Sequence, residues 1–305
     1  MAKAELKRHP LNQSKFFRLK TRPKLAAVFG LSETALQAVV DMKRPYSGRQ
    51  IESKKNGKVK TRDIQEPRGA LRPIYDRVKA LLSRIAPPDF LFCPVKRRSY
   101  VDNAARHIGA KQVRTLDVKT YFPSTPQHRV YWFFREVMEC EKDIAAILAK
   151  ILTVNGHLAT GSTASPILSF FAFYDMWHNI SDIVKAAGCK LSVYMDDVSI
   201  SGEVVRGLVV WEVQKQIHSR GLKYHKERNF KGGIAEVTGV LLRDGKTLIP
   251  NRQHLKAHLL RAELRQSVDP KRTLTIAQSL IGLQSQRKQI ESNQGHCLAR
   301  LLSSD

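Results

Sequence analysis

The sequence predicts an α+β protein in which antiparallel strands are backed by helices. Strand-like alternation and helical spacing of apolar residues interleave along the 305-residue chain without a regular strand–helix–strand period. The clearest strand pair spans residues 190–193 and 198–201, where apolar and polar residues alternate. After Pro250 the remaining chain is helical and basic. A chain of this length can bury a sizeable core and form two or three packed subdomains.

Individual elements follow from the same patterns. Residues 1–22 are polar, basic and without a period, and they predict an arm or a frayed helix. Helices are expected over residues 25–39 (interrupted at Gly30, with Ser32 capping the second part), 70–85, 128–139, 144–152, 165–187 and 204–220. Strands are expected over residues 46–64 (a hairpin with Asn56-Gly57 at its turn), 112–118, 237–242 and 247–249.

The charge balance predicts a nucleic-acid partner. The chain has 52 Lys and Arg against 27 Asp and Glu, a formal net charge of +25 that repels itself unless a polyanion neutralises it. A membrane surface is the alternative, but no run approaches the roughly eighteen apolar residues of a membrane span and no signal peptide is evident. The four cysteines are widely spaced, so we expect reduced thiols in a cytosol, without a disulfide framework or a structural zinc site.

Two acidic positions indicate a metal site. Asp196 and Asp197 lie at the tip of the predicted hairpin, and Asp117 lies near the end of the predicted strand 112–118, from which it is expected to face that tip. Three carboxylates brought together would repel and raise one another's pKa, whereas bound Mg²⁺ keeps them ionised. Two Mg²⁺ ions suit in-line phosphoryl transfer, because one activates the attacking hydroxyl and the other stabilises the leaving pyrophosphate. An Asp-Asp pair alone is more often a solvated turn; the alternating arms and the upstream Asp117 favour the metal site.

From about Tyr46 to Leu301 the chain resembles a bacterial retron reverse transcriptase. The tetrapeptide Tyr194-Met195-Asp196-Asp197 matches the Tyr-x-Asp-Asp box of that family, and Asp117 matches the metal-binding Asp of the earlier palm motif. The resemblance implies that Asp117, Asp196 and Asp197 are catalytic metal ligands, with Asp197 contributing less to direct coordination. Met195 stands where retron enzymes more often carry Ala, a departure that puts the packing of the primer end in doubt.

The resemblance also implies residues that bind the incoming dNTP. Phe122 falls where the family places an aromatic steric gate against a 2′-hydroxyl; the alternative is that Tyr121 and Phe122 are ordinary core aromatics. Arg62 lies in a segment similar to the family's Arg-x-Ile-x-x-Pro strand and is expected to clamp the triphosphate, a role that Lys60 or Arg68 could take instead.

A further box, Leu158–Pro166, resembles the family's Leu-Pro-Gln-Gly segment followed by Ser-Pro. Gly161 is expected to let the backbone approach the template and the incoming base closely. Thr160 replaces the usual Gln, which puts that residue's template contact in doubt. Arg228 likewise replaces the Lys of a later palm motif, so a possible proton donor to pyrophosphate is exchanged for a group that hardly gives up protons.

Two short strings narrow the resemblance to retron enzymes. Asn103 to His107 matches the retron-type Asn-Ala-x-x-His string, and Val237-Thr238-Gly239 matches the Val-Thr-Gly triplet that precedes the thumb. By resemblance, Asn103, His107 and the triplet engage the cognate structured RNA. The alternative for the triplet is a strand that simply ends in a turn.

Taken as a whole, the resemblance implies a right-hand polymerase. It would have an N-terminal basic helical extension (1–45), fingers (46–111), an antiparallel-sheet palm with the catalytic site (112–250) and a helical basic thumb (251–305). The implied activity is the copying of a structured non-coding RNA with dNTPs, primed from a 2′-hydroxyl, into RNA-linked single-stranded DNA (msDNA) in the bacterial cytoplasm.

An effector protein encoded nearby, in an anti-phage defence system, is also implied. Two alternatives remain: another bacterial reverse transcriptase, of group II intron or diversity-generating type, and an RNA- and DNA-binding scaffold that restrains an effector.

Overall fold

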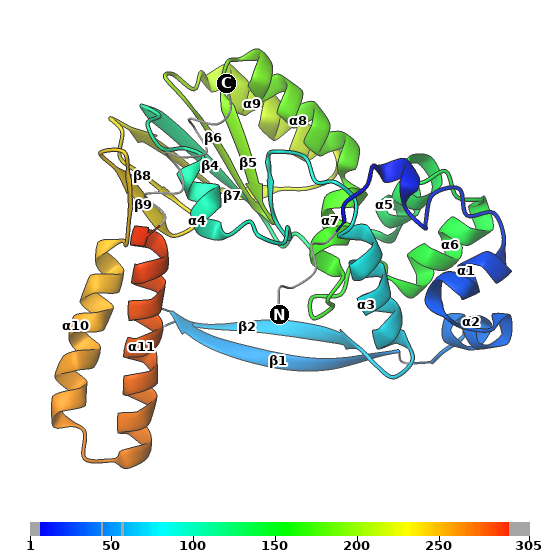
Figure 1. Ribbon diagram of the computed structural model, residues 1–305, viewed down its shortest axis with the longest axis horizontal. Coiled ribbons are helices and arrows are strands. Elements are labelled where there is room, and N and C mark those ends of the chain that lie inside the picture. Colours follow the sequence, from blue (N-terminus) through cyan, green and yellow to red (C-terminus); the bar gives the residue numbers. More distant parts are fainter. Residues whose placement is uncertain (1–6, 44, 56–57, 293–305) are drawn as a thin grey trace. The chain divides into compact units, whose positions relative to one another are not determined.

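The computed structural model describes residues 7–43, 45–55 and 58–292 (Figure 1). Helices and sheets alternate along these residues, so the protein is α+β, as predicted. The chain folds into two compact units. The first comprises Met1–Asp89, Val118–Ile180 and Gln214–Tyr224, and the second comprises Phe90–Asp117, Ser181–Val213 and His225–Asp305. Because both units are discontinuous in sequence, the contiguous boundaries of fingers, palm and thumb remain a prediction.

The first unit is mainly helical and carries one two-stranded ribbon. Its elements are η1 (Leu11–Gln13), α1 (Arg22–Phe29), α2 (Glu33–Val40), β1 (Tyr46–Lys55), β2 (Lys58–Pro67), α3 (Leu71–Leu82), α5 (Gln127–Trp132), the π-helical η2 (Phe133–Val137), α6 (Lys142–Ile151), α7 (Ser165–Ala172) and the start of α8 (Tyr174–Ala186). β1 and β2 pair antiparallel along their whole length, which confirms the predicted hairpin. Its predicted turn, Asn56-Gly57, lies outside the described residues.

The two short N-terminal helices form as predicted. α1 ends at Gly30, whose φ of +69° lies in the left-handed region that glycine adopts without a steric penalty. The Ser32 side chain caps α2 by accepting a hydrogen bond from the Ala35 amide at 3.1 Å. Leu25 and Leu36 are buried, so both helices contribute to a core.

Two helix predictions in this unit are wrong in detail. The predicted helix 165–187 is two helices, because the chain breaks at Phe173 (φ −118°, ψ 33°). Phe173 is fully buried and stacks on Tyr121 with ring centroids 6.1 Å apart, so tertiary packing overrides the helical period. The predicted helix 128–139 is α-helical only in α5 and continues as the π-helical η2.

The second unit contains two sheets and a helical hairpin. Its elements are β3 (Leu91–Cys93), α4 (Tyr100–Ala105), β4 (Gln112–Val118), β5 (Lys190–Tyr194), β6 (Asp197–Gly202), α9 (Gly207–Ser219, shared with the first unit), β7 (Tyr224–Lys231), β8 (Ala235–Val237), β9 (Val240–Arg243), β10 (Lys246–Leu248), α10 (Asn251–Gln266) and α11 (Pro270–Ser292). The five-stranded sheet has the order β3-β5-β6-β4-β7, and the three-stranded sheet has the order β10-β9-β8.

Strand pairing corrects the prediction in two places. β5 and β4 each pair antiparallel with β6 as expected, but β3 pairs parallel with β5, so the larger sheet is mixed. The predicted strand 237–242 is a hairpin, because the chain reverses at Thr238 and Gly239, whose φ angles of +45° and +82° are left-handed. The strand β7 was not predicted, since most of its residues are polar and exposed and give no apolar alternation.

α4 contacts strands of both sheets, namely β3 and β5 of the larger and β8, β9 and β10 of the smaller. Its residues Val101 and Ala104 pack in one buried cluster with Val237, Val240 and Leu242. α10 and α11 lie side by side (Figure 1), and α10 has no buried residue.

Among the described residues, no helix combines the length and apolarity needed to cross a membrane. Cys93, Cys140 and Cys189 are free thiols, which agrees with the expectation for these three cysteines. Cys297 lies outside the described residues.

Candidate active site

The Asp-Asp pair lies at the tip of the β5–β6 hairpin. Tyr194 pairs with Asp197, which leaves Met195 and Asp196 as the two turn residues. Met195 has a φ of +61°, the left-handed conformation that a tight two-residue turn requires and that a side chain opposes. The apolar residues of the arms are at most 3% exposed and share one face of the sheet: Leu191, Val193, Val198 and Ile200. Burial of that face positions the acidic tip.

Asp117 lies directly opposite Asp197 on the neighbouring strand. β4 pairs antiparallel with β6 in a register that makes Asp117 and Asp197 cross-strand partners. Side chains of such partners lie on the same face of a sheet, with Cβ atoms roughly 4.5–5.5 Å apart. Tertiary pairing thus brings together two acids that are far apart in sequence.

Electrostatics indicate that the three acids act on one another. The pKa of Asp197 is raised from 3.8 to about 7, first by burial and then by the negative charges of Asp196 and Asp117, with Lys226 and Arg228 opposing the shift. A divalent cation would relieve this repulsion, and carboxylate oxygens are the ligands that Mg²⁺ prefers. Asp117, Asp196 and Asp197 are therefore ligands of the chemical type that suits the predicted cation.

Asp117 is also engaged by basic residues of β7. Its Oδ1 lies 3.3 Å from His225 Nδ1, and its Oδ2 lies 3.8 Å from Lys226 Nζ. Within residues 7–43, 45–55 and 58–292, no three His, Cys, Asp or Glu side chains are grouped as a metal ion would hold them. The role of Asp117 as a metal ligand therefore stays a prediction.

The residues predicted to bind dNTP belong to the first unit. Arg62 is exposed on β2. Tyr121 is a core residue, since it is 5% exposed, its hydroxyl donates to the Ser169 carbonyl at 2.9 Å, and Trp177 Nε1 donates to that hydroxyl at 3.1 Å. Phe122 is only half-buried and stacks on Tyr121 at 6.2 Å. Tyr121 is therefore a core aromatic residue, whereas the partly exposed ring of Phe122 is compatible with a gate.

Close packing against β2 requires a glycine at position 161. Its amide donates to the Gln65 carbonyl at 2.9 Å, and a Cβ at this position would lie 2.6 Å from Ile64 Cγ2 and 2.9 Å from that carbonyl oxygen. Thr160 fixes the same strand, because its Oγ1 donates to the Asp63 carbonyl at 2.7 Å and accepts from the Gln65 amide at 3.0 Å. The close backbone approach expected of Gly161 is therefore made to β2, which also carries Arg62.

The residues predicted to engage RNA are mostly internal. Asn103, His107 and Val237 are 0%, 1% and 0% exposed, so their side chains offer no surface to RNA in this structure. Only Thr238 and Gly239, at the turn between β8 and β9, are half-buried. The RNA-binding role of Asn103, His107, Val237, Thr238 and Gly239 stays a prediction.

Sequence patterns did not reveal several partners of these residues. His225 and Lys226 oppose Asp117, and Ser192 and Ser201 hold the ring of His107. The one available signal was the alternation of serine with apolar residues in the hairpin arms, which predicts the face of these serines but not what they contact.

Comparison with known proteins supports the resemblance. No protein-family model matches the chain. Similar curated proteins include the retron Se72 reverse transcriptase of Salmonella heidelberg (strain 579083-10), which is 27% identical over 59% of this chain and 47% of its own length. The retron Ec86 reverse transcriptase of Escherichia coli is 24% identical over 64% of this chain and 56% of its length. The retron Mx65 reverse transcriptase of Myxococcus xanthus is 26% identical over 78% of this chain and 60% of its length.

The alignments thus span about half to three-fifths of the relatives' own length. The predicted similarity to bacterial retron reverse transcriptases is confirmed.

The carboxylate cluster predicts a pH-dependent gain in stability for Asp197→Asn. The folded-state pKa of Asp197, about 7, lies above its ordinary value of 3.8, so the protonated carboxyl favours folding at low pH and that contribution is lost as pH rises through about 7. In EDTA at pH 8.5 the Asn variant should melt higher by roughly 1–2 °C for each kcal/mol of burial cost and repulsion removed. At pH 5.5 the difference should shrink.

Differential scanning calorimetry at both pH values measures the effect, with Asp182→Asn, an exposed residue of α8, as the matched control. Equal melting shifts of the Asp197→Asn variant at the two pH values would contradict the predicted pH dependence. Added Mg²⁺ should raise the melting temperature of the wild type more than that of Asp197→Asn.

The packing of Gly161 predicts that Gly161→Ala destabilises the first unit. The new methyl group meets the backbone carbonyl of Gln65, which cannot move without shifting β2. We expect a loss of about 1–3 kcal/mol in the free energy of unfolding, measured by urea denaturation. Gly207→Ala is the control, because nothing lies within 4 Å of a Cβ at Gly207. Equal stability of the Gly161→Ala and Gly207→Ala variants would show that β2 does not constrain this loop.

Proposed function

We propose that this protein is a retron-type RNA-directed DNA polymerase that copies a structured non-coding RNA into single-stranded DNA. The observation that carries the proposal is the opposition of Asp117 and Asp197 beside Asp196, in a chain similar to retron reverse transcriptases. Priming from a 2′-hydroxyl and an RNA-linked product (msDNA) are supported by that similarity alone.

In this mechanism Asp117 and Asp196 would hold two Mg²⁺ ions, and Asp197 would add its negative charge beside them. When bound, the ions lower the pKa of the attacking hydroxyl and stabilise the leaving pyrophosphate. Arg62 binds the triphosphate through its guanidinium, whose donors match phosphate oxygens in pairs. Phe122 leaves no room for a 2′-hydroxyl, which favours dNTPs over rNTPs. Gly161 lets its loop pack closely against β2 and so holds in place the strand that carries Arg62.

The nucleic acid is proposed to follow basic residues of the helical hairpin. Lys256, Arg261 and Arg265 are exposed on α10, where they can bind backbone phosphates without reading bases. Arg252 is less free to do so, because its guanidinium donates two hydrogen bonds to Glu236, at 2.6 and 2.7 Å. In this proposal residues 46–111 are the fingers, 112–250 the palm and 251–305 the thumb.

The remaining partners follow from the similarity to retron enzymes. We propose dNTPs as substrates, a structured RNA as template and primer, and a separate effector protein in an anti-phage defence system of the bacterial cytoplasm. The charge of +25 supports the nucleic-acid partner independently.

The first test removes the carboxylates. Asp196→Asn/Asp197→Asn should lower Mg²⁺-dependent extension of oligo(dT) on poly(rA) by about 10²–10³-fold or more, because two carboxylates that would hold the metal ions are lost. A gel assay of primer extension measures this, and Asp182→Asn serves as the control with the same chemical change at an exposed site. Extension that persists in the double variant would refute the active-site assignment. Binding of the primer–template without extension by the wild type would favour the scaffold alternative.

A second test addresses the gate. Phe122→Ala should admit rNTPs and raise the ratio of rNTP to dNTP incorporation by at least tenfold, because the missing ring frees space for a 2′-hydroxyl. Phe122→Tyr keeps the ring and should keep the discrimination. Single-nucleotide incorporation kinetics with dTTP and UTP measure both variants, and an unchanged ratio in the Ala variant would reject the gate.

A further inference from the structure

His107 joins both strands of the hairpin that carries Asp196 and Asp197. Its Nδ1 lies 2.6 Å from Ser201 Oγ on β6, and its Nε2 lies 2.7 Å from Ser192 Oγ on β5. A neutral imidazole has one donor and one acceptor, so one nitrogen donates to one serine and the other accepts from the second hydroxyl. Burial lowers the pKa of His107 to about 3, which keeps the ring in this neutral form.

The two serines lie on the same face of the sheet as the acids. Asp197, Ser199 and Ser201 are every second residue of β6, so their side chains lie on one face of the sheet. Ser192 pairs with Ser199 and shares that face. Ser192, opposite Ser199, is two residues, or about 7 Å, from the level of Asp197 along the strands, and Ser201 is four residues, or about 14 Å, from it. The ring therefore joins the two strands between one and two residue pairs behind the acidic tip.

The segment that carries His107 is also bonded to the β8–β9 turn. On α4, Asn103 Nδ2 donates to Thr238 Oγ1 at 3.3 Å, and Thr238 Oγ1 donates to the Tyr100 carbonyl at 2.9 Å. These bonds hold Thr238 in its left-handed conformation. The string Asn103–His107 is thus hydrogen-bonded at one end to the Thr238-Gly239 turn and at the other end to the catalytic hairpin, and the backbone of residues 103–107 connects the two sets of bonds.

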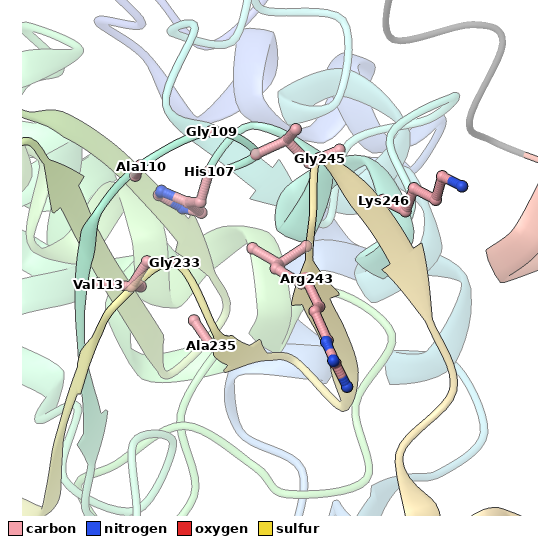
Figure 2. Close-up of a pocket in the computed structure, with 11 residues that line it drawn as sticks. His107, Gly109, Ala110, Val113, Gly233, Ala235, Arg243, Gly245 and Lys246 are labelled. Carbon is pink, nitrogen blue, oxygen red and sulfur yellow. The ribbon is translucent and has the colours of Figure 1, made fainter.

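The surroundings of His107 exclude a direct ligand role. Figure 2 shows the pocket beside it, which is lined by backbone turns at Gly109, Gly233 and Gly245 and by Arg243 and Lys246. Its enclosed space holds about one water molecule, which is too little for a nucleobase. Both ring nitrogens are already used by serines, so His107 has no free polar atom for RNA.

We propose that His107 is a positioning residue for the catalytic hairpin and that α4 couples this hairpin to the Thr238-Gly239 turn. RNA that engages the turn would act on Asp196 and Asp197 through the bonds of Asn103 and His107, without touching either side chain. The part of this inference that concerns catalysis rests on the proposed polymerase function. The mechanical link itself does not.

The test compares His107→Ala with Ser192→Ala/Ser201→Ala, which removes the same two bonds from the other side. His107→Gln, which keeps one donor and one acceptor, is the conservative variant. Thr247→Val is the control, because Thr247 is equally buried in the second unit and loses a bond of the same length, 2.6 Å to the Ile290 carbonyl, away from the hairpin.

Two readouts are needed. Amide hydrogen exchange over residues 190–202 should be at least threefold faster in His107→Ala and in the double serine variant, but unchanged in Thr247→Val. On poly(rA)·oligo(dT) with dTTP, kcat should fall at least tenfold while the Kd for the primer–template stays within twofold, with partial recovery in His107→Gln. A weaker Kd with unchanged kcat, or hairpin exchange equal to that of the wild type, would overturn the proposal.

Coupling through α4 is tested by a double-mutant cycle. Thr238→Val removes the hydroxyl and adds no branching, and it should also speed exchange over residues 190–202. If the network is continuous, the effects of Thr238→Val and His107→Ala on this exchange will be non-additive; additive effects would refute the coupling. If the wild type fails to extend the primer, the proposed function falls, while the exchange data still decide the mechanical link.

Discussion

Mutual repulsion among Asp117, Asp196 and Asp197 is the constraint on which this structure depends. Burial is the largest cause that raises the pKa of Asp197 to about 7, and the negative charges of Asp196 and Asp117 add to it. The fold holds these charges together through the opposite face of the same strands, where Leu191 pairs with Ile200 and Val193 pairs with Val198 in a buried layer. Packing of the apolar face thus opposes the repulsion between the carboxylates at the tip. Such repulsion is expected where carboxylates are brought together without a cation.

In the first unit, the loop that contains Gly161 is held against β2 by hydrogen bonds and close packing. Thr160, which departs from the family pattern, uses its hydroxyl for two backbone groups of that strand. Gly161 is required because backbone and side-chain atoms of β2 occupy the space of a Cβ. The box thus has a structural role that its resemblance to a template-binding segment did not reveal.

The short strings that narrow the resemblance are likewise internal. Asn103 and His107 are buried and hydrogen-bonded to neighbouring elements of the same unit. α4 packs its apolar residues on the smaller sheet and also contacts β3 and β5 of the larger sheet. The polar bonds to the larger sheet come from His107, which follows α4 in the chain.

Local periodicity by itself determined the hairpin arms of β5 and β6, the ribbon of β1 and β2, the strand β4 and the helix α3, because alternation and helical spacing record which face is buried. Motif residues likewise identified the acids of the candidate site. Tertiary structure alone decided that the helix breaks at Phe173, that the chain reverses at Thr238-Gly239, that Asp117 lies opposite Asp197 and that serines enclose His107. Each of these depends on contacts between residues far apart in sequence, and such contacts leave no period in the local pattern.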